Sequence, residues 1–109
     1  MSGFVLIPGA GGAGWYWSRV VPLLEAAGHH AVAIDLPADD ESAGLPEYAD
    51  IATAAVAASR EAGQGETILV AQSLGGFTAP LVCDRVPVDL LVLVNAMIPV
   101  PGEIGRAHV

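Results

Sequence analysis

The chain has 109 residues, of which 53% are hydrophobic and 15% are charged, and its mean hydropathy is +0.56. This length is typical of one small domain, and no apolar run approaches the roughly 20 residues that span a bilayer, so we expect no membrane segment. The 12 acidic residues outnumber the 4 basic ones, and the net charge of −8 argues against binding to the phosphate backbone of nucleic acids.

The first half of the chain predicts two strand–helix units. Residues 4–8 are apolar and β-forming, which predicts a strand, and a loop with almost no side chains follows. Over residues 15–27 the apolar positions recur at helical spacing, and Gly28 is expected to end that helix. Residues 31–34 predict a second strand, and the alanine-rich segment that begins at Pro46 predicts a second helix.

The second half continues this alternation. Residues 67–71 predict a third strand and residues 74–85 a third helix, which Pro80 should kink or interrupt. Residues 89–95 predict a fourth strand, and because this strand lacks polar alternation we expect cover on both of its faces. Strands and helices in this order, joined by right-handed crossovers, predict an α/β fold with a three-layer parallel sheet, as a single domain over residues 1–109.

The segment 68–77 has the sequence form of a nucleophile elbow, a sharp strand-to-helix turn that lifts a serine hydroxyl clear of a sheet. Ser73 would stand at the apex, with Gly75 two residues later and Ala71 at the earlier position where glycine is usual. Residues beside such a turn approach neighbouring backbone, so they must be small. The amide of Leu74 would then point to the place where an oxyanion forms.

A simpler interpretation is that Ser73 only caps the following helix, since serine is a favoured N-cap residue. Gly75 and Gly76 argue against it, because a plain cap needs neither glycine and both weaken the start of a helix. The elbow therefore accounts for more of the segment than the cap does.

The glycine loop 9–14 allows two interpretations. It matches G-x-G-x-x-G between a strand and a helix, and Asp35 follows about 20 residues later, as in a dinucleotide-binding oxidoreductase. However, the bulky residues 15–17 crowd a place where that fingerprint needs small side chains, and Ser73 is left without a role. A hydrolase uses both segments, because a loop after the first strand can supply a second oxyanion-hole amide opposite the elbow.

With both segments considered, the chain resembles an α/β-hydrolase, and in particular the small esterases grouped with plant methylesterases and hydroxynitrile lyases. The matching segments are residues 4–12 with Trp15, then 28–29, 35–37, 70–76 and 91–96. The resemblance implies a serine hydrolase that acts on a small-molecule ester or similar acyl substrate without a cofactor or metal. It also implies that Ser73 is the nucleophile and that the amides of Ala10 and Leu74 form the oxyanion hole. Pro8 stands where relatives often carry histidine.

In this family the triad acid and histidine follow the serine. The candidates after Ser73 lie on a helix, at the wrong end of a strand or in the trailing segment: Asp84, Asp89, Glu103 and His108. His29 and His30 precede the second strand, at the far end of the sheet from Ser73. We therefore expect a truncated α/β-hydrolase core that is inactive or weakly active. A catalytically dead module that binds a ligand and a dinucleotide-binding domain stay as alternatives.

In such a core the expected strand order is 2-1-3-4, which leaves the fourth strand at the sheet edge. A long apolar edge strand is a pairing hazard, so we expect either a homodimer through this edge or marginal stability.

Trp15 and Trp17 are expected to pack within the protein rather than to recognise substrate.

The start of the chain gives an expectation about the cellular compartment. Residues 1–3 lead directly into a strand without a basic segment or cleavage site, so we expect no secretory signal and a cytoplasmic protein. The single cysteine, Cys83, cannot form an internal disulfide, and we expect it to be a buried free thiol.

Overall fold

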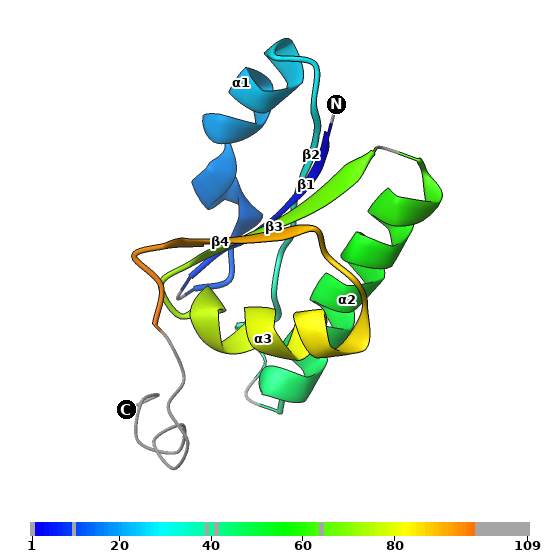
Figure 1. The fold of residues 1–109 in the computed structure, drawn as a ribbon. Helices are drawn as coiled ribbons and strands as arrows, with labels where there is room; N and C mark the ends of the chain where they lie inside the picture. Colours follow the sequence, from blue (N-terminus) through cyan, green and yellow to red (C-terminus); the bar gives the residue numbers. More distant parts are fainter. Residues whose placement is uncertain (1, 10, 39, 41, 64, 98–109) are drawn as a thin grey trace.

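The computed structural model describes residues 2–9, 11–38, 40, 42–63 and 65–97, and its centre is a parallel sheet. The sheet has four strands in the order β2-β1-β3-β4, which confirms the predicted α/β class and strand order (Figure 1). The strands are β1 (Ser2–Ile7), β2 (His30–Ala33), β3 (Glu66–Gln72) and β4 (Leu90–Val94).

Helices cover both faces of this sheet, as Figure 1 shows. They are the 3₁₀ helix η1 (Gly14–Trp17) and the α-helices α1 (Val20–Ala26), α2 (Leu45–Glu61) and α3 (Gly75–Arg85). One layer contains η1 and α1, and the other contains α2 and α3. None of the described helices is long and apolar enough to cross a membrane.

The strand sequences account for the two layers. Alternate residues of a strand point to opposite faces of the sheet. Val5, Ile7 and Leu69 are fully buried in the cluster that includes α2 and α3, whereas Leu6 and Val70 lie in the cluster that includes Trp17 of η1. Apolar side chains are therefore needed at consecutive positions, which is why β1 and β3 are continuous hydrophobic runs.

The helix predicted over residues 15–27 is divided in the structure. Its first turn is the 3₁₀ helix η1, and the regular helix α1 starts only at Val20. Pro22 gives a physical reason, because proline lacks an amide donor and is tolerated in the first turn of a helix but not further inside it. A start at Val20 keeps Pro22 within that first turn.

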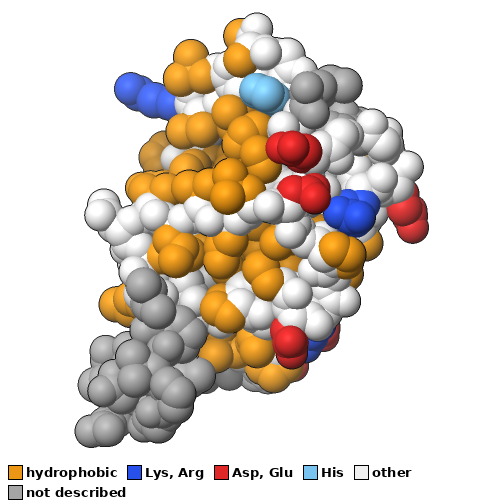
Figure 2. Space-filling model, in the orientation of Figure 1, with side chains coloured by type: hydrophobic (Ala, Val, Ile, Leu, Met, Phe, Trp, Pro, Cys, Tyr) orange, Lys and Arg blue, Asp and Glu red, His pale blue; other side chains and the backbone are white. Residues whose placement is uncertain are grey.

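The prediction that both faces of β4 are covered is wrong. Figure 2 shows hydrophobic side chains gathered on the face where β4 lies, and Leu90 is 53% exposed. Among the described elements, α1 packs mainly on β2, while α2 and α3 pack on β1 and β3. Since β4 pairs only with β3 among these elements, one edge of β4 is free.

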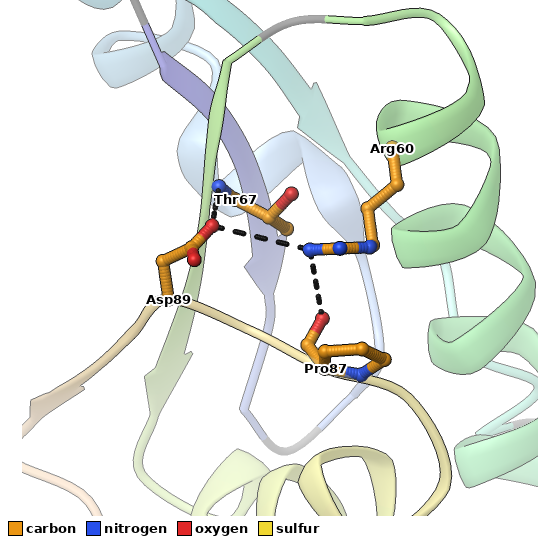
Figure 3. A network of polar contacts seen from close by, with 4 residues as sticks. All are labelled: Arg60, Thr67, Pro87 and Asp89. Atoms are coloured by element: carbon orange, nitrogen blue, oxygen red, sulfur yellow. Dashed lines mark hydrogen bonds and ion pairs between the residues drawn. The ribbon is translucent and has the colours of Figure 1, made fainter.

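A polar network holds the amino ends of β3 and β4 together (Figure 3). One carboxylate oxygen of Asp89 accepts a hydrogen bond from the Thr67 amide at 2.7 Å, and the Asp89 amide donates to the Thr67 carbonyl at 2.8 Å. Arg60 at the end of α2 donates to the Pro87 carbonyl at 3.3 Å and lies 3.9 Å from the same carboxylate oxygen. Asp89 is thus a structural residue at the amino end of the sheet.

Candidate active site

Ser73 has a left-handed backbone conformation, with φ = 53°, between the end of β3 and the start of α3. This conformation costs a residue with a side chain roughly 1–2 kcal/mol, so its surroundings must hold it in place. The Ser73 amide donates to the Val94 carbonyl at 3.3 Å. The Ser73 carbonyl accepts from the amides of Gly76 at 3.1 Å and Met97 at 2.9 Å. The predicted sharp reversal at residue 73 is confirmed, and β4 with the residues after it supports it.

The glycines after Ser73 are required by close backbone approaches. A Cβ atom on Gly75 would lie 3.0 Å from Cγ2 of Ile7 and 3.2 Å from the Pro8 carbonyl oxygen. A Cβ on Gly76 would collide with the Met97 carbonyl oxygen. Ala71, which replaces the first glycine of the usual elbow pattern, is fully buried. A methyl group is therefore accommodated before the turn but not after it.

Leu74 follows the serine as the N-cap residue of α3. Among the described residues, no carbonyl accepts a hydrogen bond from the Leu74 amide. Ala10, the other predicted donor, lies outside the described residues, but its neighbour Gly9 approaches the elbow closely. A Cβ on Gly9 would lie 3.1 Å from Cβ of Ser73 and would also collide with the side-chain oxygen of Gln72. The glycine loop and the elbow thus meet at the carboxyl ends of β1 and β3.

Asp35 anchors the glycine loop. Its carboxylate accepts a hydrogen bond from the Gly14 amide at 2.7 Å, and the Leu36 amide donates to the Gly12 carbonyl at 2.7 Å. The loop lies so close to the end of β2 that a Cβ on Gly14 would be 2.8 Å from the Ile34 carbonyl oxygen. The carboxylate that the dinucleotide interpretation assigns to a ribose therefore bonds to the protein's own loop.

Two cavities flank the junction of loop and elbow, and both are lined by Pro8 and Gly9. The larger, of about 490 Å³, lies toward α2 and α3 and is mainly apolar. Its lining includes Leu74 and Gly75 of the elbow, together with Gly11, Gly12, Leu36, Ala38, Ala43, Gly44, Leu45, Tyr48, Phe77 and Thr78. The smaller, of about 380 Å³, contains Ser73 and is also lined by Ala13, Trp15, Tyr16 and Gln72. An extended molecule held at the elbow would have space on either side.

The described histidines lie away from Ser73, as the sequence predicts. Nδ1 of His29 accepts a hydrogen bond from the Ser2 amide at 3.1 Å, and its ring packs edge-on against Phe4 at a centroid distance of 5.3 Å. His30 pairs with Gly3 at the amino ends of β2 and β1. Ser73 follows the carboxyl end of β3, so neither imidazole is placed to accept its proton.

The candidate acids are also accounted for where the structure describes them. Asp84 is exposed on α3, and Asp89 bonds to the backbone at the opposite end of the sheet. Glu103 and His108 lie outside the described residues.

The sequence interpretation missed the position of Trp15. Trp17 is 5% exposed and packs in the core as expected, but Trp15 is 80% exposed and lines the cavity that contains Ser73. The division of the predicted helix accounts for the difference, because η1 directs these two neighbouring indoles into different environments. The only available signal is the bulky Trp-Tyr-Trp sequence directly after a loop of small residues.

Comparison with protein-family models gives a match over residues 4–109 to the alpha/beta hydrolase family. The chain therefore belongs to the α/β-hydrolase family, in agreement with the sheet order and the elbow.

Among its curated relatives, the probable esterase PIR7A of Oryza sativa subsp. indica is 40% identical over 92% of this chain. Methyl jasmonate esterase 1 of Vitis vinifera is 35% identical over 90% of the chain. The crystal structure of polyneuridine aldehyde esterase superposes with a TM-score of 0.79 at 29% identity, over 93% of this chain. The chain spans 40–42% of the lengths of these three proteins.

Proposed function

We propose that this chain carries the nucleophile and oxyanion-binding part of an esterase site, and that Ser73 attacks the carbonyl carbon of a small-molecule ester. The observation that carries the proposal is the left-handed backbone of Ser73, held by hydrogen bonds from β4 and α3. Strain of this kind persists only where the surrounding structure imposes it, and it is concentrated at functional sites. The esterase names of the relatives support the ester as substrate class.

The proposed reaction has two stages. In the first, Oγ of Ser73 bonds to the carbonyl carbon, its proton passes to a base, and the carbonyl oxygen becomes an oxyanion. The amides of Leu74 and Ala10 donate hydrogen bonds to this oxyanion, and removal of one such donor typically lowers kcat about 10²- to 10³-fold. The alcohol then leaves with a proton, and an acyl-serine remains. In the second stage water attacks the acyl-serine and releases the carboxylic acid.

The base is the part of the machinery that the described residues do not supply. A serine without a base is a poor nucleophile at neutral pH. With an oxyanion hole and substrate binding alone, an acceleration on the order of 10³- to 10⁴-fold over water remains. We therefore expect slow ester turnover by the 109-residue chain, and the formation of a covalent adduct is a more sensitive measurement than the release of product.

A fluorophosphonate probe tests the nucleophile directly, because it forms a stable phosphonyl-serine that peptide mass spectrometry locates. We expect the adduct on Ser73 and its complete loss in Ser73→Ala. Ser42→Ala is the matched control, because Ser42 is an exposed serine whose hydroxyl bonds to Asp40 at 2.6 Å, and Ser73 should still be labelled in this variant. Labelling equal at both serines, or no labelling of a folded wild-type chain, would reject Ser73 as the nucleophile.

We further propose that two copies of the chain associate through the free edge of β4. Leu90, Leu93 and Val94 are exposed there, and the strand sequence LLVLV contains no lysine, proline or charge that would oppose edge pairing. In an antiparallel pair centred on Val92, every cross-strand pair would be apolar.

Analytical ultracentrifugation over a range of concentrations tests this association. We expect dimers of the wild type and monomers of Leu93→Lys. The control is Leu23→Lys, which places the same charge on an exposed leucine of α1 and should leave the dimer intact. A wild-type chain that stays monomeric at high concentration would contradict the association.

A further inference from the structure

The smaller cavity contains two exposed aromatic side chains beside the proposed nucleophile. Trp15 is 80% exposed and Tyr16 is 52% exposed, and both line this cavity together with Ser73. Single apolar side chains on a surface are common. Here two large aromatic rings line the same cavity as a serine in a left-handed conformation. This arrangement suits a ligand that carries an aromatic ring.

The backbone that carries these rings is fixed from both sides. The Tyr16 amide donates to the Ala13 carbonyl at 3.1 Å, and the Ser18 amide donates to the Trp15 carbonyl at 2.8 Å. The Tyr16 ring packs edge-on against the buried Trp17, at a centroid distance of 5.1 Å and an interplanar angle of 88°. Since binding costs less when the binding groups are already in place, this turn is a preorganised aromatic surface.

The size and chemistry of the cavity fit a planar ring. An apolar cavity of about 150 Å³ can hold a benzene molecule, and this one measures about 380 Å³. Aromatic pairs in offset or edge-to-face geometry gain about 0.5–1.5 kcal/mol beyond the burial of their surface. A saturated ring of similar size lacks this gain, so the cavity should distinguish the two.

We infer that the Trp15 cavity is a subsite for an aromatic ring of the ester substrate, and that Trp15 is a specificity-determining residue. The inference rests on the proposed function, because it assumes that the ester carbonyl lies at Ser73. The ring then lies on the η1 side of the elbow, and the remaining part of the ester extends toward the larger cavity.

Binding is measured on Ser73→Ala, in which the proposed nucleophile is absent, so that the result does not depend on catalysis. The chain contains only two tryptophans, and each gives one indole N–H cross-peak in a ¹H–¹⁵N spectrum. A second sample that also carries Trp15→Leu identifies the Trp15 peak by its loss. Phenyl acetate and methyl benzoate are titrated against cyclohexyl acetate and methyl cyclohexanecarboxylate, their saturated counterparts.

We expect at least one aromatic ester to shift the Trp15 peak in a saturable way while the buried Trp17 peak stays in place. Its Kd should be about 2- to 12-fold lower than that of the saturated counterpart, which is the aromatic gain converted to affinity. Trp15→Phe should keep most of this preference, and Trp15→Leu should remove it. Because both variants lack the Trp15 indole peak, their Kd values are measured from the shift of the backbone amide peak of Gln72. Equal affinity for both members of each pair, or an unmoved Trp15 peak, would overturn the subsite.

The two proposals can fail separately. Preferential aromatic binding without fluorophosphonate labelling of Ser73 would reject the nucleophile and keep the cavity only as a binding site for an aromatic ring. Labelling of Ser73 without any preference for aromatic esters would keep the nucleophile and reject the subsite.

Discussion

Substitution of Gly76 by alanine is the most direct test of how the elbow is held. Gly76 lies near the start of α3, where alanine is ordinarily favoured over glycine by about 1 kcal/mol. A Cβ at this position would collide with the carbonyl oxygen of Met97 and would lie 2.9 Å and 3.0 Å from its carbonyl carbon and amide nitrogen. All three atoms belong to the backbone, so no rotation of a side chain can relieve the contact.

Whether Gly76→Ala stabilises or destabilises the fold depends on the sizes of three free-energy contributions. Overpacking a tight site costs about 1–3 kcal/mol, and the hydrogen bond from the Met97 amide to the Ser73 carbonyl, about 1 kcal/mol, is lost if the segment moves away. The gain in helix propensity offsets about 1 kcal/mol of this sum. We expect Gly76→Ala to lower the free energy of unfolding by roughly 1–3 kcal/mol, a large share of the 5–15 kcal/mol that is typical of a domain.

Urea unfolding followed by circular dichroism measures this loss. With an m value of about 1–3 kcal/mol per molar urea, the midpoint should fall by on the order of 1 M. Gly44→Ala is the control for an added Cβ, because a Cβ at Gly44 would meet only ordinary contacts at 3.7 Å and 3.8 Å. Gly44 is the N-cap residue of α2, where glycine is favoured over alanine, so the midpoint of this variant should fall, but by less than that of Gly76→Ala. A Gly76→Ala protein as stable as the wild type would refute the close packing of the post-β4 segment on the elbow.

Three further residues, Ser73, Asp35 and Cys83, give testable outcomes. Ser73→Gly should raise the free energy of unfolding by about 0.5–1 kcal/mol in the same urea assay while abolishing fluorophosphonate labelling, because glycine adopts positive φ without strain. Asp35→Ala should lower it by about 1.5–3 kcal/mol, because the Gly14 amide loses a charged acceptor, whereas Asp35→Asn keeps an acceptor oxygen and most of the stability. Burial raises the pKa of the Cys83 thiol above its usual 9.0. Iodoacetamide at pH 8 should therefore modify the native chain more slowly than the urea-unfolded chain. The free energy of unfolding should also fall as the pH rises above 9.0, because the thiol of the unfolded chain loses its proton at a lower pH than the thiol of the folded chain.

Much of the fold could be predicted because the information is local. The continuous apolar runs of β1 and β3, the favourable Pro46 at the start of α2 and the strand–helix alternation each depend on near neighbours in sequence. Right-handed crossovers then restrict the topology. The sharp turn at Ser73 was predictable for the same reason, because two successive glycines weaken the start of a helix and are needed only where backbone segments approach closely.

The remaining features depend on contacts that the sequence pattern does not contain. Pro22 places the start of α1, but the pattern alone does not indicate that Trp15 is left outside the core while Trp17 enters it. The apolar composition of β4 indicates burial, yet its cover depends on how far the helices of each layer extend across the sheet. Asp35 matches a ribose-binding acid by spacing, and only its contact with Gly14 gives it a different role.

The support of the proposed nucleophile and the free edge of the sheet belong to the same strand. The Val94 carbonyl and the Met97 amide hold the left-handed residue Ser73, and both of these supporting residues are exposed. Opening of β4 would therefore release the elbow, because the strain at Ser73 is stored only while these hydrogen bonds persist. Any partner that covers the β4 edge, including a second copy of the chain, should also stabilise the left-handed backbone of Ser73. Stability at the sheet edge and the proposed reactivity of Ser73 are consequently coupled through two hydrogen bonds. The amide of Ser73 should therefore exchange with solvent more slowly when that edge is covered.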